Sequence, residues 1–398
     1  MTNQANSTLL RNVRAVLPDR VSEKTNLLIQ SGRITHVVES SFDSRDGGAL
    51  SADATLDLEG LTLYPGFIDV HIHGSVGVDT MEADTPDLAR VSEFLATQGV
   101  TGWLPTLVPA PHEDYERAIR AIDEAISSPA GVATTRILGV HYEGPFVNTA
   151  QCGALRREHF KSYAGPRDLE TLPLPKTRDA VRLITLAPEV EGGVELVREL
   201  TRRGWIVSIG HTRAAVAVLE QAFAAGARHM THFMNAMAPF HHRSPGPIAW
   251  GLSRDDVTCD FIADGVHLDP FMLQLLTRLK GENQLLLISD AIAAAGQGDG
   301  AYQIWGETIT VRDGKTSNAH GSIAGSVITM HSAMRLMRSL GATEVGVARM
   351  AATNPARLLG LEGDCGSIEE GKRADLVALD ENGRVQLTMV GGELAFSR

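Results

Sequence analysis

Through the middle of the chain, short apolar runs alternate with stretches whose apolar residues recur at helical spacing. Eight runs have the length and composition of buried β-strands, near residues 66–72, 100–108, 136–142, 182–187, 205–210, 227–231, 257–262 and 285–289. Most segments between them are amphipathic, as with Leu88, Val91 and Leu95 between Pro86 and Gly99. Strands that alternate with helices in this way predict an α/β fold, a (β/α)8 TIM-type barrel over residues 65–365.

The two ends of the chain carry a different pattern, in which short strands are separated by turns. Near the start, residues 27–29 and 34–38 flank a Ser-Gly-Arg turn, an arrangement typical of a β-hairpin. Near the end, the apolar runs 374–379 and 385–390 are divided by turn-forming residues. Strand-rich ends around a different middle predict one small β-sandwich domain built from both termini, residues 1–64 and 366–398.

The composition is ordinary for a globular enzyme, and it narrows the partners. No apolar run in the 398 residues approaches the roughly 18 residues that a membrane span needs. The net charge of −12 argues against general binding of nucleic acid, although a few local cations suffice to hold one phosphate group. The N-terminus lacks the pattern of a secretory signal, and Cys152, Cys259 and Cys365 form no CxxC pair. We therefore expect a cytoplasmic protein that binds neither membranes nor nucleic acid.

Residue types that bind metals fall where the predicted barrel strands end. They are His71 and His73 after the first strand, Glu143 after the third, His211 after the fifth, His232 after the sixth and Asp290 after the eighth. The C-terminal ends of barrel strands form the mouth at which active sites lie, so these side chains are expected to converge. A single strand-end histidine is more often structural than a ligand, but the whole set favours a divalent metal. Imidazole and carboxylate ligands without thiolate suit zinc, and also iron, manganese or cobalt.

Several motifs resemble one enzyme family over nearly the whole chain. Residues 65–74 (PGFIDVHIHG) and 366–377 (GSIEEGKRADLV) are similar to the first-strand signature and the closing segment of the amidohydrolase superfamily. Within it, the chain resembles the N-acetylglucosamine-6-phosphate deacetylases. This resemblance rests on the motifs 141–146 (HYEGPF), 210–212 (GHT), 231–246 (THFMNAMAPFHHRSPG), 263–267 (ADGVH), 289–296 (SDAIAAAG) and 321–326 (GSIAGS). The run at 231–246 is specific to the deacetylases, whereas the closing segment identifies only the superfamily.

The resemblance implies metal-dependent hydrolysis of N-acetyl-D-glucosamine 6-phosphate to D-glucosamine 6-phosphate and acetate. It implies that Glu143, His211 and His232 hold the principal metal, and that Asp290 is the catalytic acid and base. It also implies a homodimer, because in the family some phosphate contacts come from a neighbouring subunit. The substrate-binding residues would be Ala154, Asn235, Ala236, Arg243, His267, Ile323, Ala324 and Gly325. Arg243 could instead form a surface ion pair and His267 could be structural, but the planar guanidinium of Arg243 matches the geometry of a phosphate.

The first-strand histidines leave the number of metals at one or two per subunit. His71 and His73 are two residues apart, so they point to the same side of their strand. Family members that keep this pair can hold two metals with the glutamate bridging. We therefore expect a second, weaker site formed by the pair with Glu143 and Asp290. The alternative is that both histidines only hydrogen-bond water or substrate.

One position departs from the family pattern, and two other functions stay open. Leu155 stands where the family commonly has a histidine that contacts the substrate, and Arg156 or His159 could take over that contact. The first alternative function is deacetylation of a related sugar such as N-acetylgalactosamine 6-phosphate. The second is a non-catalytic binding protein on the same barrel, although such relatives typically lose ligands that this chain keeps. Cyclic-amide hydrolases are disfavoured, because they usually carry a carboxylated lysine on the fourth strand, and residues 182–187 contain none.

Overall fold

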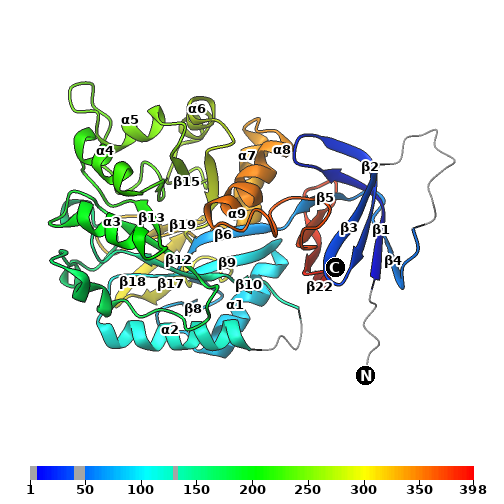
Figure 1. Cartoon of the computed structure of the whole chain (residues 1–398), viewed down its shortest axis with the longest axis horizontal. Coiled ribbons are helices and arrows are strands. Elements are labelled where there is room, and N and C mark those ends of the chain that lie inside the picture. The colour runs from blue at the N-terminus through cyan, green and yellow to red at the C-terminus, as the bar shows by residue number, and fades with distance from the viewer. Residues whose placement is uncertain (1–6, 40–49, 129–132) are drawn as a thin grey trace.

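The computed structural model describes residues 7–39, 50–128 and 133–398 of the chain. At its centre, eight parallel strands of the described residues follow one another around a barrel (Figure 1). They are β6 (Phe67–Ile72), β9 (Val100–Leu107), β11 (Gly139–Glu143), β12 (Val181–Leu186), β13 (Ile206–Ile209), β14 (His229–Met230), β15 (Thr258–Ile262) and β16 (Leu285–Ile288). A short strand, β10 (Arg136–Ile137), pairs with β9 just before β11. Both faces of most barrel strands are buried, which explains their nearly continuous apolar runs. The predicted TIM-type barrel is confirmed.

The barrel is closed between its first and last strands by hydrogen bonds at their ends. The main-chain N–H of Asp290 donates to the carbonyl of His71 at 2.9 Å. Just before it, the hydroxyl of Ser289 donates to Oδ2 of Asp69 at 2.5 Å, and both side chains are buried. Residues from the start and the end of the barrel therefore meet at one seam.

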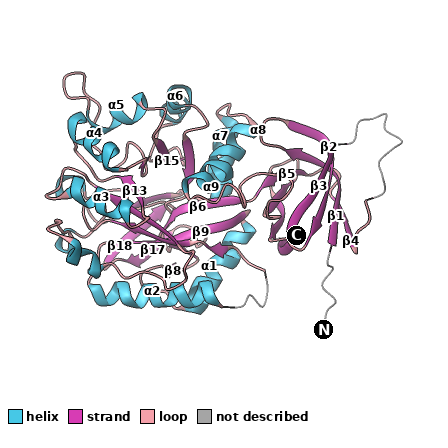
Figure 2. Cartoon of the chain, viewed as in Figure 1, coloured by secondary structure: helices cyan, strands magenta, loops and turns pink. Residues whose placement is uncertain are grey.

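Helices cover the outside of the barrel (Figure 2). Within the described residues they are α1 (Thr85–Thr97), α2 (His112–Ser127), α3 (Gly193–Arg202), α4 (Val216–Ala225), α5 (Gly246–Ser253), α6 (Pro270–Lys280), α7 (Met330–Ser339), α8 (Glu344–Ala348) and α9 (Asn354–Leu358). The first helix begins as its sequence predicts, because Pro86 lies in its first turn and Asp84 caps it by accepting from the N–H of Asp87 at 2.9 Å. It ends before Gly99, whose φ of +79° suits glycine. Short 3₁₀ turns η1 (Thr149–Gln151), η2 (Arg157–His159) and η3 (Pro166–Thr171) lie between β11 and β12, and the π-helical turn η4 (Arg349–Thr353) joins α8 to α9.

The expected β domain from both chain ends is also present. Its strands are β1 (Ser7–Val16), β2 (Val21–Gln30), β3 (Arg33–Glu39), β4 (Ala54–Asp57), β5 (Thr62–Pro65), β20 (Leu376–Leu379), β21 (Val385–Val390) and β22 (Glu393–Ser397), joined in one sheet of the described residues. The blue N-terminal and red C-terminal strands lie side by side in Figure 1, because β5 pairs antiparallel with β20. Leu10, Leu27, Ile34 and Leu376 are among the buried residues of its own core. Residues 1–6 and 40–49 of the expected segment 1–64 lie outside the described residues.

Polar contacts fasten this domain to the barrel. The guanidinium of Arg14, on β1, donates to both carboxylate oxygens of Glu344, on α8, at 2.6 and 2.8 Å. The hydroxyl of Tyr64 donates to the same carboxylate at 3.1 Å. Such a bidentate contact fixes the relative orientation of the guanidinium and the carboxylate as well as their distance. The two domains are thus held in one relative position close to the barrel seam.

An antiparallel insert follows the last barrel strand, and the sequence did not predict it. It consists of β17 (Gly300–Ile304), β18 (Glu307–Arg312) and β19 (Lys315–Ser317). A smaller hairpin, β7 (Gly74–Ser75) with β8 (Val78–Asp79), follows the first barrel strand. Among the described residues, no helix is both long enough and apolar enough to cross a membrane.

Candidate active site

The predicted metal-binding side chains meet at the C-terminal mouth of the barrel. All six are buried, and each comes from the end of a barrel strand or from the first two residues after it. His211, His232 and Asp290 leave their strands with left-handed backbone, at φ values of +47°, +31° and +50°. Non-glycine residues are rare in this region and cluster at functional sites, where the surrounding structure enforces the conformation.

Glu143, His211 and His232 form one cluster. Oε1 of Glu143 lies 2.8 Å from Nε2 of His211 and 2.9 Å from Nε2 of His232. The two imidazole nitrogens are 3.0 Å apart. Three ligand atoms on separate strands therefore converge on one point.

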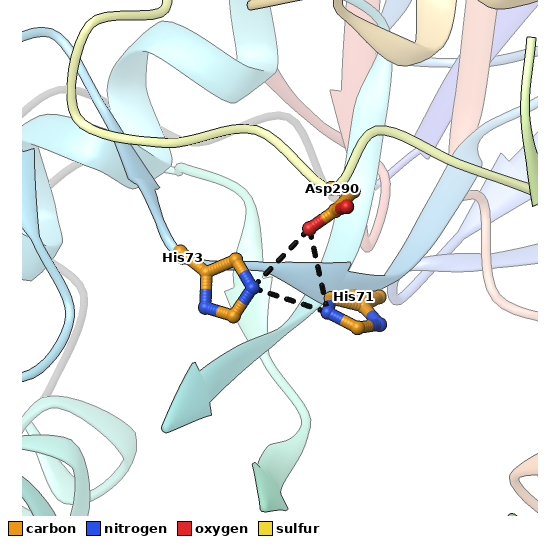
Figure 3. Close-up of side chains that lie close together, drawn as sticks. All are labelled: His71, His73 and Asp290. Atoms are coloured by element: carbon orange, nitrogen blue, oxygen red, sulfur yellow. Dashed lines mark hydrogen bonds and ion pairs between the residues drawn. The ribbon is translucent and has the colours of Figure 1, made fainter. Parts of the chain in front are cut away.

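His71, His73 and Asp290 form a second cluster beside the first, and Figure 3 shows their side chains pointing toward one another. Oδ1 of Asp290 lies 3.2 Å from Nε2 of His73 and 3.5 Å from Nε2 of His71. The two ring nitrogens are 3.2 Å apart. Glu143 joins the clusters, because its other oxygen, Oε2, lies 3.3 Å from Nε2 of His73.

This arrangement fits divalent metal ions. In a tetrahedral site with bonds of about 2.0–2.1 Å, ligand atoms lie about 3.3–3.4 Å apart, close to the separations seen here. Nδ1 of His211 donates to the carbonyl of Gln151 at 2.7 Å, which leaves the lone pair of its Nε2 facing the cluster. The set is four imidazoles and two carboxylates, a mixture that zinc, iron, manganese and cobalt all accept.

The charges of the two carboxylates favour a cation at this point. Burial opposes a charge on His73, but its bonds to Asp290 and Glu143 outweigh burial and raise its pKa to about 10. Burial likewise opposes a charge on His232, yet Glu143 raises its pKa to about 9. Burial would raise the pKa of Glu143, but the surrounding imidazoles hold it well below the usual range. A divalent ion would compete with these protons for the same lone pairs.

A layer of buried polar side chains, which the sequence did not indicate, lies behind the clusters. Nδ1 of His141 donates to the carbonyl of Val70 at 3.1 Å, so its Nε2 accepts from the hydroxyl of Thr185 at 2.8 Å. Burial keeps this imidazole neutral by lowering its pKa to about 3. The ring of His141 packs edge-on against that of His71, with centroids 4.6 Å apart. The layer thus fixes a metal-facing ring from behind.

Asp260, on β15, supports His232 in a similar way and was also missed. Its Oδ1 accepts from the main-chain N–H of His232, the residue with the left-handed backbone. Its Oδ2 lies 2.8 Å from Nε2 of His229. Both side chains of this pair are fully buried. A lone aspartate inside an apolar strand was the only available signal for this role.

A pocket of about 160 Å³ opens above the clusters. It is lined by most of the predicted substrate-binding residues, namely Ala154, Asn235, Ala236, His267, Ile323 and Gly325. Ala324 is fully buried between the last two and is not part of the lining. Nδ1 of His267 lies 2.6 Å from Oδ2 of Asp264, which orients the ring.

Arg243 and the loop around Leu155 are placed differently from the other predicted residues. Arg243 is exposed and lies outside the lining of the pocket, where it donates to Nε2 of His242 at 2.9 Å. Leu155 does line the pocket, whereas Arg156 and His159 do not. Trp305, from the insert, also lines the pocket, which the sequence did not indicate.

Comparisons with known proteins find similar chains over nearly the full length. The amidohydrolase family matches residues 62–395. An N-acetylglucosamine-6-phosphate deacetylase of Bacillus subtilis is 35% identical over 396 residues, which cover 98% of either chain. An N-acetylgalactosamine-6-phosphate deacetylase of Escherichia coli O157:H7 is 37% identical over 339 residues, 84% of this chain and 87% of the relative. The solved structure of a mutant N-acetyl-D-glucosamine-6-phosphate deacetylase of Mycobacterium smegmatis, in complex with N-acetyl-D-glucosamine-6-phosphate, has a TM-score of 0.85, 31% identity, and coverage of 99% of this chain and 100% of that chain.

Proposed function

The chain belongs to the amidohydrolase family, and we propose that it hydrolyses N-acetyl-D-glucosamine 6-phosphate to D-glucosamine 6-phosphate and acetate. The observation that carries this proposal is the convergence of two ligand clusters on one carboxylate, Glu143, at the floor of a pocket. Relatives that bear the deacetylase name align over nearly the full length of the chain, which includes every residue of both clusters.

The metal site is assigned to the residues that meet there. Glu143, His211 and His232 would hold the principal ion, and His71, His73 and Asp290 a second, weaker one, with Glu143 between them. A divalent ion in this place supplies polarisation of the acetamide carbonyl and a lower pKa for water. Zinc is our choice for the native metal, because the ligand separations of 3.2–3.5 Å in the second cluster match the tetrahedral geometry that zinc favours.

Asp290 is the proposed acid and base. Its carboxylate belongs to the second cluster and lines the pocket. The main chain of Asp290 is fixed by hydrogen bonds at both its N–H and its carbonyl. A carboxylate in this position can accept a proton from water and later deliver it to the departing amine nitrogen. Since no other carboxylate besides Glu143 lines the pocket among the described residues, the proton transfer falls to Asp290.

We assign the sugar phosphate to the part of the pocket away from Asp290 and the histidine pair. Asn235 and His267 provide polar groups there, with Ala154, Ala236, Ile323 and Gly325 around the sugar. Arg243 is exposed and does not line the pocket of its own chain, so we assign its phosphate contact to the pocket of a neighbouring subunit in a homodimer. The homodimer and a cytoplasmic location stay predictions.

A second candidate substrate is the galactosamine epimer, because one relative of comparable identity is an N-acetylgalactosamine-6-phosphate deacetylase. A non-catalytic binding protein is the weaker alternative, since every expected ligand and the acid are retained and brought together.

Acetate release after reconstitution with Zn²⁺, Mn²⁺, Fe²⁺ or Co²⁺ tests the function. We expect metal-dependent acetate from N-acetylglucosamine 6-phosphate, with a lower kcat/KM for the galactosamine epimer and for unphosphorylated N-acetylglucosamine. A reversed epimer preference would reassign the substrate. No acetate from either epimer, in protein that binds metal, would overturn the deacetylase proposal.

A further inference from the structure

The hairpin between β17 and β18 turns on a residue that such turns do not favour. Trp305 and Gly306 are the two central residues, with φ values of +54° and +78°. Two-residue turns with positive φ at both positions select asparagine, aspartate and glycine, because larger side chains are strained there. A tryptophan in this place indicates a role for its side chain that the turn itself does not require.

The indole of Trp305 reaches from the insert to the metal clusters. Its ring meets that of His73 edge-on, with centroids 5.2 Å apart and planes at 84°. The ring also packs against the small core of the insert, which includes Ile292, Ile304 and Ile309. Its buried Nε1 atom makes no hydrogen bond of regular geometry, but the indole lies beside the carboxylate of Asp79. Burial raises the pKa of Asp79 to about 6, and the indole N–H opposes this rise, so packing and a polar neighbour together place the ring. Trp305 is therefore a fixed apolar wall beside the second cluster.

The position of Trp305 corresponds to that expected for the acyl group of the substrate. Hydrolysis requires the amide carbonyl to lie at the clusters, and the rest of the acyl group extends from that carbonyl carbon. The proposed function assigns the sugar and phosphate to Asn235 and His267, which leaves the side of His73 for the acyl group. The side chain that closes the pocket there is Trp305.

We propose that Trp305 sets the size of the acyl group that this enzyme accepts, and so restricts it to acetyl. The inference rests on the proposed deacetylase function. A rigid ring against the acetyl methyl leaves no space for further carbons, because displacing the ring would also displace the packed core of the insert. One methylene that an apolar pocket accepts or refuses changes kcat/KM by roughly 10–200-fold.

Two variants test the wall while the hairpin is kept. Trp305→Asn removes the ring and creates Asn-Gly, a favoured pair for this turn, so it should fold at least as well as the parent. Trp305→Phe keeps a smaller ring. The substrates are the N-acetyl, N-propionyl and N-butyryl forms of glucosamine 6-phosphate. We expect the propionyl-to-acetyl ratio of kcat/KM to rise by about 10–200-fold in Trp305→Asn, and by less in Trp305→Phe.

A second measurement does not depend on turnover. Cobalt(II) bound at the clusters should quench the fluorescence of the adjacent indole, because quenching by a paramagnetic ion falls steeply with distance. Trp103, Trp205 and Trp250 do not line the pocket, so Trp305→Phe should lose most of the cobalt-dependent quenching while it binds the same amount of cobalt.

The outcomes separate the two proposals. A wild-type protein that binds metal but releases no acetate contradicts the deacetylase function itself. An active wild type, with acyl ratios that do not change in either variant, overturns only the role of Trp305. Equal cobalt quenching in wild type and Trp305→Phe would overturn it as well, since the ring would then not lie beside the metal.

Discussion

The Asp290→Asn variant should fold, bind metal at Glu143, His211 and His232, and lose most of its turnover. Asparagine tolerates the left-handed backbone of this position, where φ is +50°. The main chain of residue 290 also keeps both of its hydrogen bonds, to the carbonyl of His71 at 2.9 Å and from the N–H of Ser326 at 2.8 Å. The fold therefore does not depend on the charge of the side chain.

The loss should appear in kcat, because an amide oxygen cannot take up the proton of the attacking water. General acid–base catalysis contributes about 10²–10⁴-fold. This range corresponds to about 2.7–5.4 kcal/mol of activation free energy. The KM should change much less, since Asp290 contacts His73 and His71 in the second cluster and the sugar phosphate is assigned to Asn235 and His267.

The assay is acetate release at saturating metal, together with metal content and thermal unfolding of the same preparation. Asp290→Glu is the matched control, because it keeps a carboxylate at altered reach and should retain more activity than asparagine. A kcat within a few-fold of wild type in a folded, metal-loaded Asp290→Asn protein would remove Asp290 from the mechanism.

Three further outcomes are expected. Arg243→Ala should weaken use of phosphorylated substrate by about 1.5–3 kcal/mol relative to unphosphorylated N-acetylglucosamine, because it removes a charge-assisted contact; equal losses in kcat/KM on both substrates would contradict this. The double variant His71→Gln, His73→Asn should bind one equivalent of metal where the wild type binds a second, weaker one, and identical titrations by calorimetry would leave the pair outside the metal site. Glu344→Gln should lower the free energy of unfolding by about 1–2 kcal/mol at pH 7, because Arg14 loses its bidentate carboxylate and keeps the exposed Glu23 as a charged partner. Arg14 holds the pKa of Glu344 below its usual value of 4.5. The difference between wild type and variant should therefore be complete at neutral pH and disappear as the pH falls below 4.5; a difference that persists in acid denaturation would show a purely steric role.

The barrel and its ligands could be predicted because their signals are local. Each barrel strand is buried on both faces and is therefore a compact apolar run, and the ligands follow directly in sequence. His71 and Asp290 could be placed together because barrel closure always brings the first and last strands into contact.

The residues that support the metal ligands, and those that form the pocket walls, are brought to the site by tertiary structure. They therefore leave no local signal in the sequence. Asp260 and His141 sit inside apolar strands, where a polar residue does not indicate its partner. The insert was missed because β17 is mostly exposed and carries no clear alternation of apolar and polar residues. The reach of Trp305 depends on how that insert folds back. The exposure of Arg243 outside the pocket depends on the fold of its loop, which its sequence does not indicate.

The seam between β6 and β16 links assembly of the second cluster to the last step of barrel folding. The bond between Ser289 and Asp69 joins residues 220 positions apart in the chain. Contacts of such long range form late, because the entropy of closing the intervening chain must be overcome first. A nascent or partly folded barrel can already contain Glu143, His211 and His232 on neighbouring strands, but the second cluster needs Asp290 beside His71 and His73. An ion that binds across both clusters selects the closed ring over every open form and stabilises it by mass action. A chain with metal bound would then populate open forms of the barrel less than a metal-free chain.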